Sequence, residues 1–174
     1  MYYELWKFAR QILPQKSIWK DGELWSAIAG GIAAYFWFRH NPSMVGKIRH
    51  HFGDLLTATS IIFGFTLSAL LFYIQAAAAW SEGESVARVA VKIVDWHVWT
   101  ILCLLFLISY ILGLWSLGVR WSDTSTLTSG LYGSLVFLLL YCGFQILNHT
   151  LTIWWAFRSR EQLSERRKGS NDAT

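Results

Sequence analysis

The stretch LLTATSIIFGFTLSALLFYIQAAAAW, residues 55–80, decides the fold of this chain. It contains no charged residue. At about 1.5 Å per residue, a helix of this length crosses a hydrocarbon layer of roughly 30 Å. The stretch therefore predicts a helix that spans a membrane.

One face of this predicted span carries a row of small residues. Ser60, Gly64 and Ser68 recur at intervals of four, and Thr57 and Gln75 extend the same face. Small residues at this spacing let two helix backbones approach closely in lipid. We expect the row to be a packing surface, either against the chain's own helices, against a second copy in a homo-oligomer, or facing a pore.

The composition indicates an all-α integral membrane protein. Of the 174 residues, 54% are hydrophobic and 15% charged, whereas soluble domains have about 25% charged residues. The net charge is +4, and the basic residues gather near the ends of the chain. This distribution favours contact with the anionic headgroups of a lipid bilayer and predicts no direct binding of nucleic acid.

Four spans are predicted, at about 24–38, 54–79, 97–118 and 130–157, together forming a bundle over residues 24–157. The first span is short, since 15 residues reach only about 22 Å. With four crossings, eleven Lys and Arg residues lie on the side of the two termini and four lie opposite; without the first crossing the division is seven against eight. The positive-inside rule therefore favours four crossings, with both termini cytoplasmic.

Two terminal segments flank the predicted bundle. Residues 1–23 contain an amphipathic pattern over 1–13 that Pro14 ends, which predicts a helix in the membrane interface rather than a cleaved leader. Residues 158–174 form a basic cytoplasmic tail, expected to begin as a helix and to end as a disordered polar run.

Other spans carry residues with the same packing chemistry. Ser26, Gly30 and Ala34 form a second small-residue row, which we expect to pack against the first. Ser109 and Gly113 form a close-packing pair in the third span. These residues predict helix packing rather than chemistry.

The fourth span holds a polar face composed of Gln145, Asn148, His149 and Thr152, at offsets of 0, 3, 4 and 7. Polar groups in hydrocarbon need partners, because an unsatisfied amide there costs several kcal/mol. The face predicts either a hydrated path or ligand-responsive network, or hydrogen bonds between helices. The sequence leaves both interpretations open.

Charged residues and histidines near the span ends provide further candidates. Arg88, Lys92 and Asp95 form a stripe that could dock a soluble partner or remain a solvated face. Asp95 and His97 could relay protons or cap a helix. The histidines at 40, 50 and 51 could bind a metal or belong to a polar loop, and the loop is the interpretation we prefer.

The sequence contains no motif for catalysis and predicts no catalytic residue, metal or cofactor. The expected function is therefore that of a non-enzymatic oligomeric membrane sensor or effector. A pore-forming protein and an accessory subunit of a larger transporter or enzyme complex are the alternatives.

The four-span pattern and the motif SIIFGFTLSALLFYI at 60–74 resemble the membrane component of the Kiwa anti-phage defence system. The resemblance implies a homo-oligomer in a bacterial inner membrane that senses infection. It also implies a soluble DNA-binding partner on the cytoplasmic side. No functional residue is transferred from it.

Overall fold

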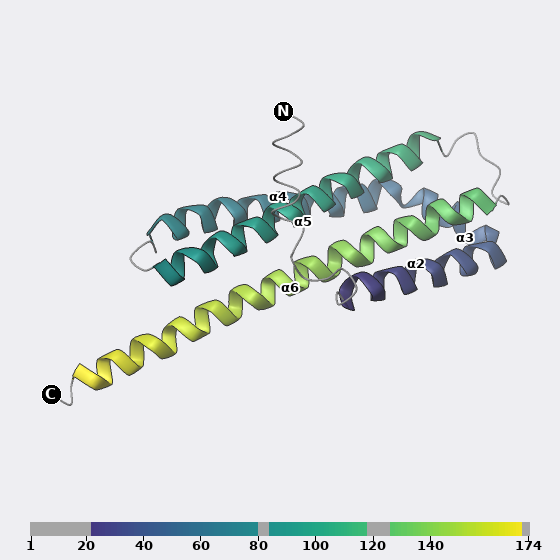
Figure 1. Ribbon diagram of the computed structural model, residues 1–174. Coiled ribbons are helices and arrows are strands. Elements are labelled where there is room, and N and C mark those ends of the chain that lie inside the picture. The colour runs from purple at the N-terminus through teal and green to yellow at the C-terminus, as the bar shows by residue number, and fades with distance from the viewer. Residues whose placement is uncertain (1–21, 80–83, 118–125, 172–174) are drawn as a thin grey trace, which may run out of the picture.

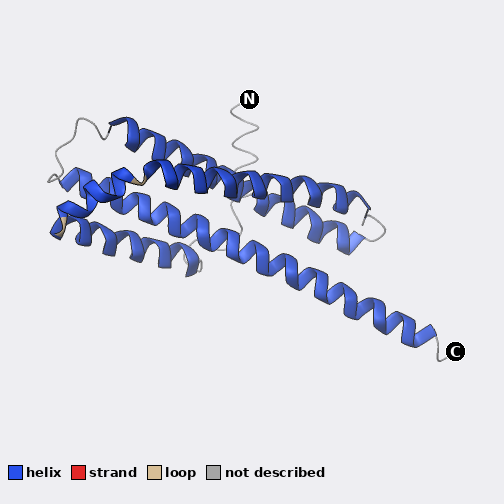
Figure 2. Ribbon diagram, turned by 180° about the vertical axis from the view of Figure 1, so that it is seen from behind, coloured by secondary structure: helices blue, strands red, loops and turns tan. Residues whose placement is uncertain are grey.

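The computed structural model describes residues 22–79, 84–117 and 126–171, and every regular element in these ranges is a helix. The helices are α2 (Gly22–His40), α3 (Pro42–His50), α4 (Phe52–Ala79), α5 (Glu84–Leu117) and α6 (Thr126–Asn171). Figure 2 shows the same architecture from behind, with short connections between the helices at one end. The prediction of an all-α chain is thus confirmed, while the amphipathic segment at 1–13 lies outside the described residues.

The four long helices form an open row in which each packs mainly against its neighbour. α4 packs on α5, α5 on α6 and α6 on α2, and α3 connects α2 to α4 at one end (Figure 1). Neighbouring helices run antiparallel. Since α2 and α4 are on opposite sides of the α5–α6 pair, each keeps a face that no described helix covers.

The turn between α2 and α3 follows from the dipeptide Asn41–Pro42. Proline cannot continue a helix but suits the first position of a new one, and it occupies that place in α3. The Asn41 backbone N–H donates to the carbonyl of Trp37 at 2.9 Å, and its side-chain Nδ2 donates to the same carbonyl at 3.2 Å. These bonds cover a carbonyl that the end of α2 would otherwise leave unpaired.

A close helix crossing joins α2 to α6 through two glycines. A Cβ atom on Gly133 would lie 3.0 Å from the Gly31 carbonyl oxygen and 3.2 Å from the Tyr35 Cα atom. A Cβ on Gly31 would lie 2.8 Å from that of Phe137. Because backbone atoms cannot move aside cheaply, these glycines set the distance between α2 and α6.

The position of α2 differs from the expectation that its small-residue row packs against α4. Ala27 and Gly31 are buried, whereas Ser26 is exposed and Gly30 faces Leu140 of α6. Ala34 is partly buried beside the apolar core. The partner of α2 is α6, and the face used is displaced by one residue from the predicted row.

Aromatic and aliphatic side chains fill the space where α3 and α4 meet α5 and α6. Tyr132 of α6 lies 5.8 Å from Phe38 and 5.9 Å from Phe52, measured between ring centroids. The buried face of α5 repeats at helical spacing. It consists of Leu104, Leu107, Ile111 and Leu114.

Two hydrogen bonds fix the register of α5 on α6. The Trp99 Nε1 atom donates to the Tyr141 hydroxyl at 3.2 Å, and the Tyr110 hydroxyl donates to the Leu131 carbonyl at 3.0 Å. Both bonds give a buried or half-buried polar group a partner from the next helix, as an apolar surrounding requires.

Within the part of the chain that the structure describes, three helices are long and apolar enough to cross a membrane, over Phe52–Gln75, Val94–Leu117 and Thr126–Leu151. They correspond to the second, third and fourth predicted spans. α2 is not among the three; its 19 residues extend about 28 Å. Exposed large apolar side chains along these helices, Phe65, Phe72 and Phe106 among them, are typical of contact with lipid.

Two helices extend well beyond these spans. α5 begins at Glu84, so the segment before the third span is continuous with it, as expected. α6 continues for 20 residues past Leu151, or about 30 Å, and is helical to Asn171, so the tail begins as a helix. Figure 1 shows this part of α6 projecting past the other helices.

We predict that Gly133→Leu destabilises the protein by about 1–3 kcal/mol, because the new side chain meets backbone atoms of α2. The matched control is Gly143→Leu on the same helix, where nothing lies within 4 Å of the added Cβ. Thermal unfolding in detergent, followed by circular dichroism, measures the difference. Equal stability of the two variants would contradict the described crossing.

Candidate functional site

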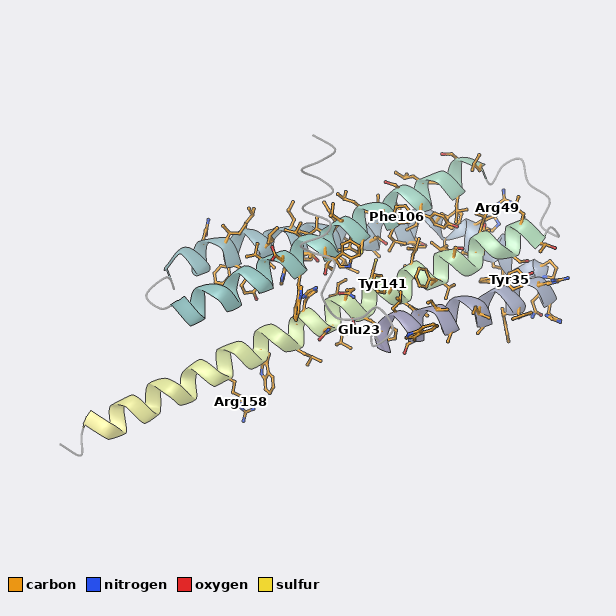
Figure 3. The ribbon with its side chains drawn as sticks, in the orientation of Figure 1. Glu23, Tyr35, Arg49, Phe106, Tyr141 and Arg158 are labelled. Carbon is orange, nitrogen blue, oxygen red and sulfur yellow. The ribbon has the colours of Figure 1, made fainter. Side chains whose placement is uncertain are left out.

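The predicted polar face of α6 is divided between two neighbouring helices. Gln145 donates from Nε2 to a carboxylate oxygen of Glu23 on α2 at 3.2 Å, and Figure 3 shows Glu23 at the start of α2 beside α6. His149 is buried against α5, with its ring centroid 6.0 Å from Trp96. Asn148 is exposed, and the Thr152 side chain lies outside the described residues. The structure therefore separates Gln145, which faces α2, from His149, which faces α5, and does not gather the predicted polar face at one site.

That site is a cluster of three rings from three helices. His149 of α6 and His97 of α5 have ring centroids 5.0 Å apart, and Tyr73 of α4 lies 5.0 Å from His97 on centroids. Both imidazoles are more than nine-tenths buried, with 7% of His149 and 4% of His97 exposed. Three neighbouring helices thus meet at a polar centre near one end of their apolar spans.

A cavity of about 260 Å³ opens beside these rings, and we call it the histidine pocket. Its polar lining contains hydroxyls as well as imidazoles. One of them, Thr100 Oγ1, donates to the Trp96 carbonyl at 3.1 Å. The lining residues from α4 are Phe65, Thr66, Ala69 and Tyr73, those from α5 are His97 and Thr100, and those from α6 are Ile146, His149 and Thr150.

One atom in the histidine pocket lacks a partner. The Nε2 atom of His149 is buried, and no described residue hydrogen-bonds it. Nε2 presents a lone pair when the ring proton is on Nδ1 and a donor when the proton is on Nε2 itself. A buried polar atom of this kind needs a partner such as water or a small ligand. The pocket is therefore suited to a small molecule that forms a hydrogen bond with Nε2.

The small-residue row of α4 lies on the outside of the chain. Ser60, Gly64 and Ser68 are all exposed, and no atom of another helix lies within 4 Å of a Cβ built on Gly64. Ser68 Oγ donates to the Gly64 carbonyl at 2.9 Å. This bond satisfies the hydroxyl within α4, so the face is compatible with lipid or with another helix.

Three further predicted positions, Ser109, Gly113 and Asp95, do not line the histidine pocket. Ser109 is exposed, and Gly113 has nothing within 4 Å of an added Cβ. Asp95 is half-buried, at the start of the apolar span Val94–Leu117. The side chains of Arg88 and Lys92 lie outside the described residues.

The described residues contain no group of three or more His, Cys, Asp and Glu side chains that could hold a metal ion. His51 Nδ1 lies 3.1 Å from Asp54 Oδ2, while His40 Nδ1 lies 2.8 Å from the Phe36 carbonyl. These two histidines of the 39–53 segment are thus held in separate local contacts. The histidine pocket has two imidazoles without a carboxylate among its lining residues.

Sequence reasoning placed His149 in a polar face but did not pair it with His97 or Tyr73. A signal for the pairing was present. The midpoint of positions 97 and 149 is 123, which lies between the third and fourth predicted spans at 97–118 and 130–157. In an antiparallel hairpin, residues at equal distance from the turn lie opposite one another.

Comparison with known proteins identifies no relative of this chain. No protein-family model matches it, and neither a curated protein nor a solved structure does.

We predict that His149→Leu stabilises the empty protein by about 1 kcal/mol, because it removes a buried polar atom that has no protein partner. His97→Leu is the comparison variant, since His97 does have a further interaction within the described residues and its loss should destabilise. Chemical unfolding in detergent micelles gives both free energies. A lower stability of His149→Leu than of the unsubstituted protein would contradict the prediction.

Proposed function

We propose that this chain is a non-enzymatic membrane sensor or effector that assembles into a homo-oligomer through α4. One observation carries the proposal: one face of α4 lines the histidine pocket, and the opposite face carries the outward small-residue row. Thr66, Ala69 and Tyr73 line the pocket, whereas Gly64 and Ser68 are exposed. At 100° per residue, position 68 is turned by about 200° from position 66, so the two sets occupy nearly opposite faces.

This arrangement provides a physical route from stimulus to assembly. A molecule bound at His149 Nε2 contacts side chains of α4, α5 and α6 together and therefore favours one packing of α4 on α5. A rotation or shift of α4 changes the angle at which the small-residue row meets a second copy. Binding in the pocket and association through the row are then coupled, and the coupling is reciprocal.

We further propose that α2 is a fourth crossing, which places both termini on the cytoplasmic side of a bacterial inner membrane. α2 lies antiparallel to α6 and is close to the length that a span requires. The Glu23 side chain, which would be costly in hydrocarbon, bonds Gln145 near the end of the α6 span. The charge distribution of the whole sequence supports the same orientation.

The projecting part of α6 is the surface that we propose for a soluble cytoplasmic partner. Residues 158–171 contain five Lys and Arg residues and two glutamates, on a helix that continues past the apolar spans. The helical start of α5, which bears Arg88 and Lys92, extends at the same end. Together with the resemblance to the Kiwa membrane component, this surface supports a role in antiviral defence.

The test of assembly is Gly64→Leu. We predict that it weakens self-association by about tenfold while leaving the stability of the single chain unchanged, because the added side chain meets only the second copy. The mass of the particle in nanodiscs, measured over a range of protein concentrations, reports the change.

Gly143→Leu is the control, since it adds the same side chain at an open position outside any small-residue row. A monomeric wild-type particle would contradict the proposed assembly, as would equal association of the two variants. For the defence role, a bacterial host expressing the chain with its genomic neighbours is challenged with phage. Protection should be lost with Gly64→Leu and kept with Gly143→Leu.

A further inference from the structure

The end of the bundle opposite the histidine pocket contains a second and larger cavity, of about 440 Å³. This volume lies within the range of small-molecule sites in proteins. We call it the end cavity. Its apolar walls come from four helices and include Trp37 and Phe38 of α2, Ile48 of α3, Leu55 of α4, and Tyr132 and Leu139 of α6.

The depth of the end cavity matches the outer part of a bilayer leaflet. Both apolar spans that line it, Phe52–Gln75 and Thr126–Leu151, begin at this end. From Tyr132 to Leu139 the wall follows α6 for seven residues, or about 10 Å along its axis. The cavity therefore extends from near the membrane surface into the region of the acyl chains.

The mouth of the end cavity is basic. Lys47 and His51 belong to its lining and are exposed. Among the described residues Lys47 has no ion-pair partner, while His51 contacts Asp54. Across residues 39–54 there are three Lys and Arg residues and one acidic residue, and Figure 3 shows Arg49 on α3 at this end.

We infer that the end cavity is a binding site for one anionic phospholipid. An acyl chain fills the space between α2, α4 and α6, and the phosphate lies at the headgroup level beside Lys47. The apolar walls account for binding of the acyl chain, and the basic mouth accounts for binding of the negatively charged phosphate. A resident lipid would hold α3 between α2 and α4, at the end where those helices are joined.

Native mass spectrometry of the delipidated full-length protein tests this inference. The protein is supplied with phosphatidylglycerol or with phosphatidylcholine of the same acyl composition. We expect one phosphatidylglycerol to remain bound per chain, with about fivefold preference over phosphatidylcholine. Lys47→Gln should remove that preference, and Arg158→Gln, which removes one charge from the projecting part of α6, should preserve it.

A second pair of variants tests the cavity itself. Leu139→Trp fills the space and should abolish retention of either lipid, whereas Leu147→Trp on an exposed part of the same helix should not. Circular dichroism melts identify any variant that fails to fold, and in that case Val136→Phe replaces Leu139→Trp, because Val136 lines the same cavity.

Three results would overturn the inference. Equal retention of the two lipids would show that the mouth does not recognise charge. Release of phosphatidylglycerol by inorganic phosphate would show that the headgroup alone is bound. Retention of no lipid, with formation of a dimer that Leu139→Trp abolishes, would assign the end cavity to a second copy of the chain.

Discussion

The cost of an unpaired polar group in hydrocarbon governs this structure more than any other constraint. Thr57, Thr66 and Ser68 donate to carbonyls of their own helix, so these three hydroxyls are paired within α4. Gln145 reaches across 122 positions of sequence to Glu23, and the bond joins the start of α2 to α6. Among the buried side-chain nitrogen and oxygen atoms of the described residues, His149 Nε2 is the exception, because it has no hydrogen-bond partner. An exception at the junction of three helices is the feature on which the proposed sensing depends.

The open row of helices gives α4 a different position from the others. α5 and α6 are each covered by two neighbours, but α4 packs mainly on α5 and is the least enclosed of the three apolar spans. Its inner face helps to form the histidine pocket, and its outer face is free of other described helices. A helix with one partner can shift at lower cost than a helix held from both sides, since fewer packed contacts change. This asymmetry makes α4 the suitable element to connect a bound stimulus to assembly.

The apolar spans could be predicted from the sequence because length and lack of charge determine them, as at 55–80. The face of α2 could not, since Ala29, Gly30 and Gly31 are all small and the choice between them depends on Leu140 and Phe137 of α6. The polar residues of α6 were recognised as needing partners, but the identity of those partners depends on helix order. Because α6 lies between α2 and α5, Gln145 bonds Glu23 of α2 and His149 lies against Trp96 of α5. To pair His97 with His149, one must see that both residues are equally far from the connection between the third and fourth predicted spans.

The most direct measurement of the proposed assembly is cysteine cross-linking along α4 in intact membranes. Single cysteines are placed at positions 57–72 and oxidised, with the unsubstituted chain as the background for the free thiols Cys103 and Cys142. The structure predicts cross-linked dimers with a helical period, strongest at Ser60, Gly64 and Ser68 and weakest at Ile62, on the opposite side of the helix. Cross-linking that is absent, or that has no helical period, would contradict a homo-oligomer formed through α4.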